Sequence, residues 1–161
     1  METTSFDLIE EFQTEDISGS PHRSLNHSRI INRFCVALDQ FDSEFDTFPE
    51  LELELTTGKC KPDLCIYKNL PIDWYNDTIF FTQAPIVAVE ILSPKQALSE
   101  LTDKAFKQYF PAGVQVVWII IPTFRTTHIL LPNGELIILS SSALLKDPVT
   151  GVEVNLKSIF R

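Results

Sequence analysis

The sequence has few of the features that mark membrane-spanning, secreted or zinc-binding proteins. No apolar run approaches the roughly 20 residues that a membrane-spanning helix needs. The N-terminus begins Met-Glu-Thr-Thr and has no basic-then-apolar signal pattern, so a cytoplasmic protein is expected. Among the cysteines Cys35, Cys60 and Cys65, the last two lie five residues apart in a strand-like segment, on opposite faces. A zinc site is therefore disfavoured, and buried free thiols are the simpler interpretation.

Basic residues are also scarce. The 13 lysines and arginines are outnumbered by 22 acids, and the net charge of −9 disfavours a protein that coats nucleic acid by electrostatics alone. The acidity is local: through residue 54 there are thirteen acids and three arginines, whereas from residue 55 on nine acids face ten basic residues. A local basic surface in the second part of the chain therefore stays open.

The length of 161 residues and the 44% hydrophobic content predict one domain with a core of its own. Residues 1–20 contain six acids and no lysine or arginine, and they end in a Gly-Ser-Pro turn signal. We expect residues 1–22 to form an acidic N-terminal arm that lies on a single domain of residues 23–161.

Apolar periodicity predicts a helix followed by a strand. Ser24 or Asn26 caps a helix from Leu25 to Phe41, and His27 lies on its apolar face. The alternating run Leu51–Leu55 predicts a strand with one buried face. Glu50, with Glu52 and Glu54, shares the other face, which is expected to be solvated unless one of them reaches a site at the edge of the strand.

Val114–Ile121 is apolar apart from Gln115, so it is expected at the centre of a sheet that is covered on both faces. The other expected elements are strands at 61–67 and 86–92, a connection at 68–84 pinned by Trp74, a helix at 95–110, a hairpin at 126–139 and a covering tail at 144–156. This order predicts an α+β fold in which helices flank a central mixed sheet, with a parallel step through the second helix and a C-terminal hairpin.

Glu90 is the one charged residue in the apolar run Ile86–Leu92. An ionised carboxylate without a partner inside such a strand would cost several kcal/mol or would take up a proton. Either a cation contacts Glu90 or the strand has one wet side at this point.

Asp63, near the start of the preceding strand, is the candidate neighbour of Glu90. Opposed side chains on neighbouring strands stand about 5 Å apart, and two carboxylates that close repel each other unless positive charge lies between them. Oxygen ligands of this kind suit Mg²⁺ or Mn²⁺. Such an ion polarises a phosphoryl oxygen and activates water, which phosphodiester hydrolysis requires.

Lys104 is the candidate cationic side chain. It lies on the flank of the predicted helix at 95–110, about 120° from the centre of the apolar stripe, and its long side chain can bend back toward the strands. The alternative is structural: Asp63 caps a strand, Glu90 pairs with a lysine, and Lys104 is a solvated helix residue.

Together these residues resemble the Uma-two family of restriction-endonuclease-like proteins, within the PD-(D/E)xK nuclease superfamily. The resemblance runs from about residue 25 to the C-terminus. It is carried by Pro62-Asp63, Val89-Glu90-Ile91-Leu92-Ser93-Pro94, Lys104, Tyr109, Ala112-Gly113-Val114 and Trp118.

The resemblance implies a restriction-endonuclease-like core in which Asp63 and Glu90 bind metal, with the backbone carbonyl of Ile91 as a further ligand. Leu92 stands where the superfamily has a lysine, two residues after the glutamate. The family is similar in lacking that lysine, and Lys104 falls at the position of the helix lysine that is thought to replace it.

Two further residues belong to the resemblance. Tyr109 comes five residues after Lys104, whereas four is the more usual spacing in the family. His27 resembles a histidine in the family's first helix and is an additional candidate ligand; a hydrogen-bonded histidine on an apolar face is the alternative.

These observations lead to two hypotheses of function. The first is a Mg²⁺- or Mn²⁺-dependent nuclease acting on DNA, with Asp63 and Glu90 holding metal and Lys104 supporting the attacking water. The second is a non-catalytic domain that uses the nuclease scaffold for protein or nucleic-acid binding. A homodimer, with the acidic arm packed on its partner, is compatible with both.

Overall fold

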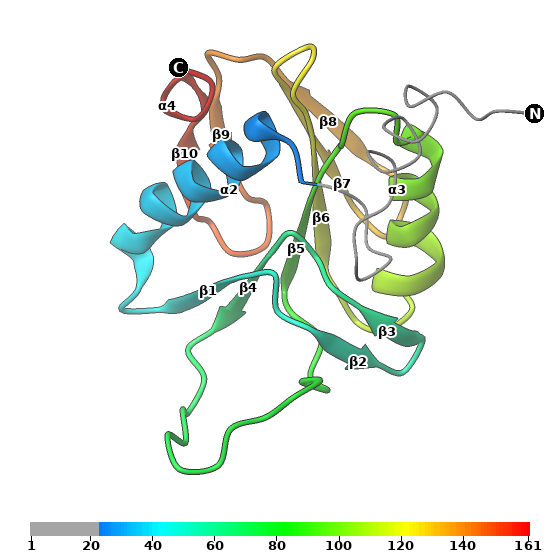
Figure 1. The fold of residues 1–161 in the computed structure, drawn as a ribbon. Helices are drawn as coiled ribbons and strands as arrows, with labels where there is room; N and C mark the ends of the chain where they lie inside the picture. Colours follow the sequence, from blue (N-terminus) through cyan, green and yellow to red (C-terminus); the bar gives the residue numbers. More distant parts are fainter. Residues whose placement is uncertain (1–22) are drawn as a thin grey trace, which may run out of the picture.

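A six-stranded mixed sheet forms the centre of the computed structural model, which describes residues 23–161 (Figure 1). The strand order is β1-β4-β5-β6-β7-β8, and only the β5–β6 pair is parallel. The strands are β1 (Phe45–Pro49), β4 (Leu64–Lys68), β5 (Val87–Ile91), β6 (Val116–Ile121), β7 (Thr126–Leu130) and β8 (Leu136–Leu139). The predicted α+β class, with its mixed sheet and its parallel step, is confirmed.

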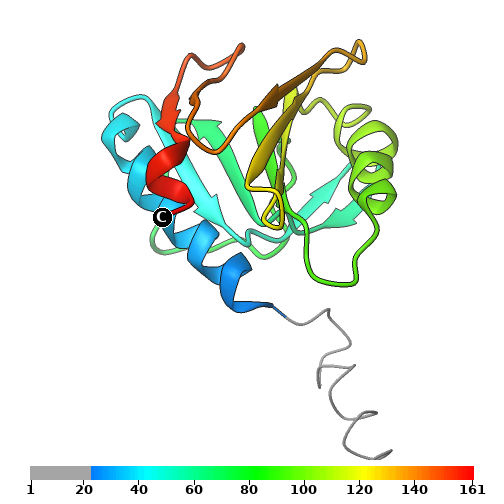
Figure 2. The ribbon, with the colours of Figure 1, turned by 90° about the horizontal axis from the view of Figure 1, so that it is seen from above.

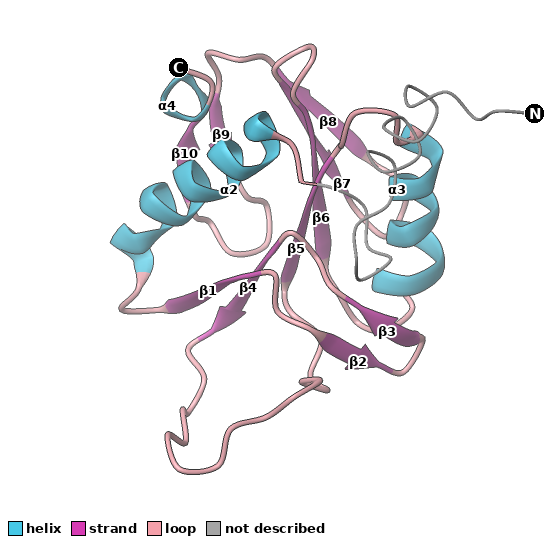
Figure 3. Ribbon diagram, viewed as in Figure 1, coloured by secondary structure: helices cyan, strands magenta, loops and turns pink. Residues whose placement is uncertain are grey.

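Helices and small hairpins cover both faces of the sheet (Figures 2 and 3). One face carries α2 (Leu25–Leu38), α4 (Leu156–Ile159) and the hairpin of β9 (Leu144–Lys146) and β10 (Glu153–Asn155). The other face carries α3 (Leu98–Lys104), the π-helical turn Ala105–Tyr109 and the hairpin of β2 (Leu53–Leu55) and β3 (Gly58–Cys60). A 3₁₀ turn, Asp39–Phe41, follows α2.

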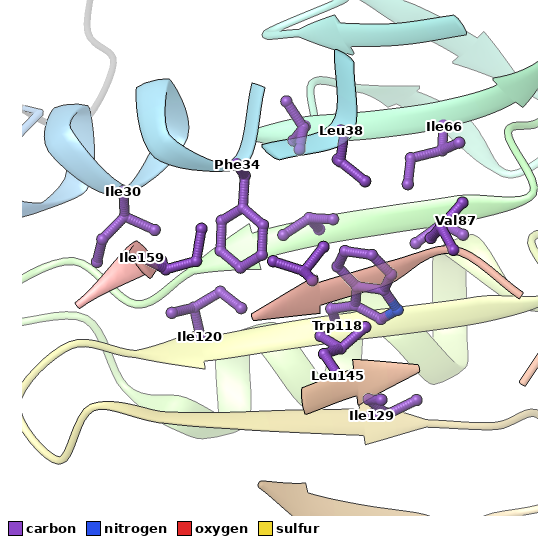
Figure 4. Close-up of a cluster of buried hydrophobic side chains, with 14 of the residues drawn as sticks. Ile30, Phe34, Leu38, Ile66, Val87, Trp118, Ile120, Ile129, Leu145 and Ile159 are labelled. Carbon is purple, nitrogen blue, oxygen red and sulfur yellow. The ribbon is translucent and has the colours of Figure 1, made fainter. Parts of the chain in front are cut away.

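The two central strands are buried along their whole length because both faces of the sheet are covered. Alternate residues of β5 therefore enter different cores: Val87, Val89 and Ile91 face α2, whereas Ala88 faces α3. On the α2 side the rings of Phe34 and Trp118 lie 6.0 Å apart between centroids and join the helix to β6 (Figure 4). This contact fixes α2, whose N-terminal turn reaches the candidate site.

The strand predicted at Leu51–Leu55 is present in its last three residues, which form β2 with Leu53 and Leu55 buried and Glu54 exposed. It belongs to a separate hairpin, and the strand beside β4 is β1. One expected feature was wrong. Trp74 does not pin the 68–84 connection, because its side chain is 90% exposed. The base of that connection is held instead by the Tyr67 hydroxyl, which donates to the Gln83 carbonyl at 2.7 Å.

The predicted acidic arm of residues 1–22 lies outside the described residues. Within residues 23–161, no helix is both long enough and apolar enough to cross a membrane.

The packing of α2 predicts a large effect of truncating Phe34. Phe34→Ala should lower the free energy of unfolding by about 3–5 kcal/mol, because it leaves a cavity beside Trp118. Val36→Ala, on the same helix at a side chain that is 67% exposed, is the matched control and should change stability by less than about 0.5 kcal/mol. Equal losses in the two variants, measured by urea unfolding, would contradict this packing.

Candidate functional site

Asp63 and Glu90 come together at one end of the β4–β5 pair. The antiparallel register aligns Leu64 with Val89, so the next positions along the two strands are Asp63 and Glu90. Both carboxyl groups are buried, at 3% and 4% exposure. Asp63 Oδ2 accepts a hydrogen bond from the Ile91 backbone N–H at 2.7 Å, which holds this carboxylate against the end of β5.

Glu90 meets two side chains from the α3 side of the sheet. Its Oε1 lies 2.8 Å from Lys104 Nζ and also accepts a hydrogen bond from the Tyr109 hydroxyl. Burial raises the pKa of Glu90 above its ordinary value of 4.5; the charge of Lys104 opposes this shift, and the neighbouring Asp63 adds to it. Burial, followed by the negative charge of Glu90, raises the pKa of Tyr109 well above its ordinary value, so its hydroxyl remains a donor at neutral pH.

Lys104 and Tyr109 reach the same carboxylate because the helix between them widens. Residues five apart in an α-helix point about 140° away from each other. Here the Phe110 N–H bonds to the Ala105 carbonyl at 2.9 Å, which is a π-helical turn. The extra residue turns Tyr109 back toward Lys104, whose Nζ lies 5.7 Å from the centroid of the tyrosine ring. The unusual five-residue spacing is accommodated by this turn.

Asp63 is contacted from the α2 side of the sheet. His27 Nε2 lies 2.9 Å from Asp63 Oδ1, and Arg23 Nη1 lies 3.5 Å from the same oxygen. His27 is buried at 1% exposure, and its backbone N–H donates to the capping hydroxyl of Ser24 at 3.1 Å. The Nδ1 atom of His27 has no hydrogen-bond partner within residues 23–161.

Arg23 and Glu50 are site residues that sequence reasoning missed. Arg23 Nε lies 3.0 Å from Glu50 Oε1, so the arginine bridges Glu50 and Asp63. The Glu50 backbone N–H bonds to the Asp63 carbonyl at 3.1 Å, and its φ of 51° lies in the left-handed region. The only available signals were the position of Arg23 just before the helix cap and the expectation that one glutamate of the 50–54 segment could reach a site.

The predicted site residues other than His27 line one pocket of about 180 Å³. Asp63, Glu90, Ile91 and Lys104 contribute to it, together with Arg23, Lys61, Ser93 and Gln96. Leu92 packs instead against the core on the α3 side. The site therefore combines two buried carboxylates with three cationic side chains.

The oxygen donors of this pocket fit a hard divalent cation. The protein can offer the carboxylates of Asp63 and Glu90 and the backbone carbonyl of Ile91. Within residues 23–161, no three His, Cys, Asp or Glu side chains gather as a metal-binding group. Mg²⁺ in proteins is commonly coordinated by one or two carboxylates and several waters, so this donor set suits its usual coordination.

Comparisons with known proteins identify the family to which the chain belongs and confirm its fold. The family model "Uma2: Putative restriction endonuclease" matches residues 8–156, so the chain belongs to that family. The crystal structure of "a putative nuclease belonging to DUF820" from Anabaena variabilis ATCC 29413 is similar, with a TM-score of 0.76 and 22% identity, covering 88% of this chain and 84% of that one. That likeness confirms the nuclease fold. No curated protein matches the chain.

The raised pKa of Glu90 predicts how stability depends on pH. A carboxyl with a raised pKa binds its proton more tightly in the folded state, so folding loses stability as the pH rises above the unfolded value of 4.5. The Glu90→Gln variant lacks this titration. We expect its stability relative to wild type to increase with pH above 4.5, measured by urea unfolding at a series of pH values; a decreasing difference would contradict the shift.

The π-helical turn predicts that one residue can be removed from it. Deleting the exposed Lys107 makes the turn α-helical and leaves Lys104 and Tyr109 four residues apart, still on one face. A double-mutant cycle between Lys104→Met and Glu90→Gln should then give the coupling energy of the wild type. Deleting Asp103 is the control, because it rotates Lys104 by about 100° relative to the buried Leu101. If the coupling between Lys104 and Glu90 were lost only in the Lys107 deletion, the conclusion that the π-helical turn accommodates one extra residue would be contradicted.

Proposed function

We propose that this protein is a Mg²⁺- or Mn²⁺-dependent nuclease that hydrolyses phosphodiester bonds of DNA. The observation that carries the proposal is the convergence of Asp63, Glu90 and Lys104 on one pocket: Asp63 comes from the residue before β4, Glu90 from β5 and Lys104 from α3. Membership of a family described as a restriction endonuclease supports the reaction class. The roles below come from the contacts of these residues.

Asp63, Glu90 and the Ile91 carbonyl would hold the cation, which when bound supplies charge stabilisation for the phosphoryl oxygens and an activated water. Lys104, with its ammonium group 2.8 Å from Glu90 and partly exposed in the pocket, can neutralise charge that develops on a phosphoryl oxygen. Tyr109 is a positioning residue, because its hydroxyl orients the Glu90 carboxylate.

The proposal predicts that the carboxylates are needed for both metal binding and cleavage. In Asp63→Ala and Glu90→Ala, Mn²⁺ affinity measured by calorimetry and DNA cleavage should each fall by at least about 100-fold. Glu52→Gln, at an exposed acid that does not line the pocket, removes one charge as a matched control and should retain both. Metal-dependent cleavage that survives in either alanine variant would overturn the assignment.

The alternative is a non-catalytic domain that binds nucleic acid or protein. It is favoured by one observation: both carboxylates already have cationic partners in the protein, with Lys104 on Glu90 and Arg23 on Asp63. Leu92 in place of the strand lysine points the same way. Wild-type protein that neither binds Mn²⁺ nor cleaves DNA, yet retains a nucleic-acid or protein partner, would favour this function.

Two other expectations stay predictions. Homodimerisation is tested by sedimentation at several protein concentrations. The cytoplasmic location, expected from the N-terminal sequence, is tested by fractionation of cells that express the chain.

A further inference from the structure

A second pocket, lined by arginines, lies at the same end of the sheet's strands as the candidate site. It has a volume of about 150 Å³ and forms where the first turns of α2 meet the β6–β7 turn and the end of the chain after α4. Its polar lining consists of Asn26, Arg29, Arg125 and Arg161, and we call it the arginine pocket.

The arginine pocket concentrates positive charge. Arg29, Arg125 and Arg161 come from three separate parts of the chain, and all three are exposed. Among residues 23–161, no acidic side chain lines the pocket and none of these arginines forms an ion pair. The neighbouring Arg33 has a lowered pKa, first through desolvation and then through the like charges of Arg161 and Arg29.

Such a cluster is unexpected in a chain with a net charge of −9. Acids are plentiful, so arginines with a purely structural role would have carboxylates available to them. Like charges held together with no acidic side chain of residues 23–161 beside them favour an anionic ligand. The planar guanidinium group binds phosphate with two parallel hydrogen bonds, so an arginine cluster suits a phosphate group.

The arginine pocket and the candidate site lie next to each other at one end of the sheet's strands. The start of α2 contributes to both, with Arg23 in the candidate site and Arg29 in the arginine pocket. Strands β5 and β6 are parallel, so their carboxyl ends lie side by side at this end of the sheet, where the Leu92 N–H donates to the Ile120 carbonyl at 2.9 Å. Arg23 and Arg29 are six residues apart near the start of a helix, a separation on the order of 10 Å. A nucleic-acid strand carries a phosphate every 3.4 Å of its axis, so the two arginines are about three phosphates apart along such a strand.

We propose that the arginine pocket binds a backbone phosphate of the same nucleic-acid strand whose scissile phosphodiester lies at Asp63 and Glu90. Arg29, from α2, and Arg125, from the β6–β7 turn, bind the phosphate, and Arg161 adds positive charge. The contact positions the strand without reading its sequence. The inference rests on the proposed nuclease function and adds to it the direction in which the strand leaves the site.

The test uses a labelled DNA duplex and fluorescence anisotropy in EDTA at several salt concentrations. In the double variant Arg29→Gln/Arg125→Gln, Kd should rise on the order of 10-fold. The slope of log K against log salt should fall by about 2, one for each lost contact, alike for unrelated duplex sequences. Lys68→Gln is the matched control. This exposed lysine is the last residue of β4, at the opposite end of that strand from the candidate site, so its substitution should leave Kd and the salt slope unchanged.

The outcomes separate this inference from the nuclease proposal. If wild type cleaves DNA and the double variant binds like Lys68→Gln, the arginine pocket fails and the nuclease proposal stands. If the double variant loses affinity as expected but no cleavage is found, the phosphate site stands and the nuclease proposal fails. Wild-type protein that does not bind DNA overturns the inference. So does inorganic phosphate that shifts the Arg29 and Arg125 side-chain NMR signals without competing with DNA.

Discussion

The structure of the site depends on how the buried charge of Glu90 is compensated. A carboxylate on a strand that is covered on both faces is tolerated only with a close cation and hydrogen bonds, and removing one member of such a pair costs about 3–5 kcal/mol. Lys104 and Tyr109 meet this requirement together. To do so they must project from the same side of one helix although they are five residues apart. The π-helical turn follows from that demand, because a regular α-helix would satisfy only one of the two contacts.

The compensation is divided between the two layers that cover the sheet. Glu90 is neutralised from the α3 side by Lys104, and Asp63 is contacted from the α2 side by Arg23 and His27. The pocket is therefore close to charge balance before any ligand enters. A lone cation would have to displace these partners, and a lone phosphate would face the carboxylates. If a cation bound together with a phosphate, Asp63 and Glu90 would hold the cation, and the side chains of Arg23 and Lys104 would be free to contact the phosphate. Joint binding of the two ligands would then replace both sets of contacts.

The parts predicted from sequence were those in which one residue type conflicts with its surroundings. Glu90 interrupts an apolar run, Asp63 follows from strand register, and Lys104 follows from its place on the flank of an amphipathic helix. Two kinds of feature escaped. β1 is a half-buried edge strand whose burial does not alternate, and Asp46 and Pro49 weaken the strand propensity of Phe45, Thr47 and Phe48. Arg23 and Glu50 enter the site through the path of the backbone, including the left-handed conformation of Glu50, which no local pattern announces. Trp74 shows the converse, since a large apolar residue was taken for an anchor and is exposed.

The acids beyond the C-terminus of α2 have little effect on a polyanionic ligand at this site, because screening limits the range of each charge. At physiological ionic strength the Debye length is about 8 Å. The helix α2 has 14 residues and is roughly 20 Å long, so Asp39 and Asp42 beyond its C-terminus lie more than two Debye lengths from the pocket at its N-terminus. Among residues 23–161, the charges near the pocket are those of Arg23, Lys61 and Lys104 against the carboxylates of Asp63, Glu90 and Glu50. Of the charges on these residues, this small group has the largest effect on the potential that a phosphate meets there.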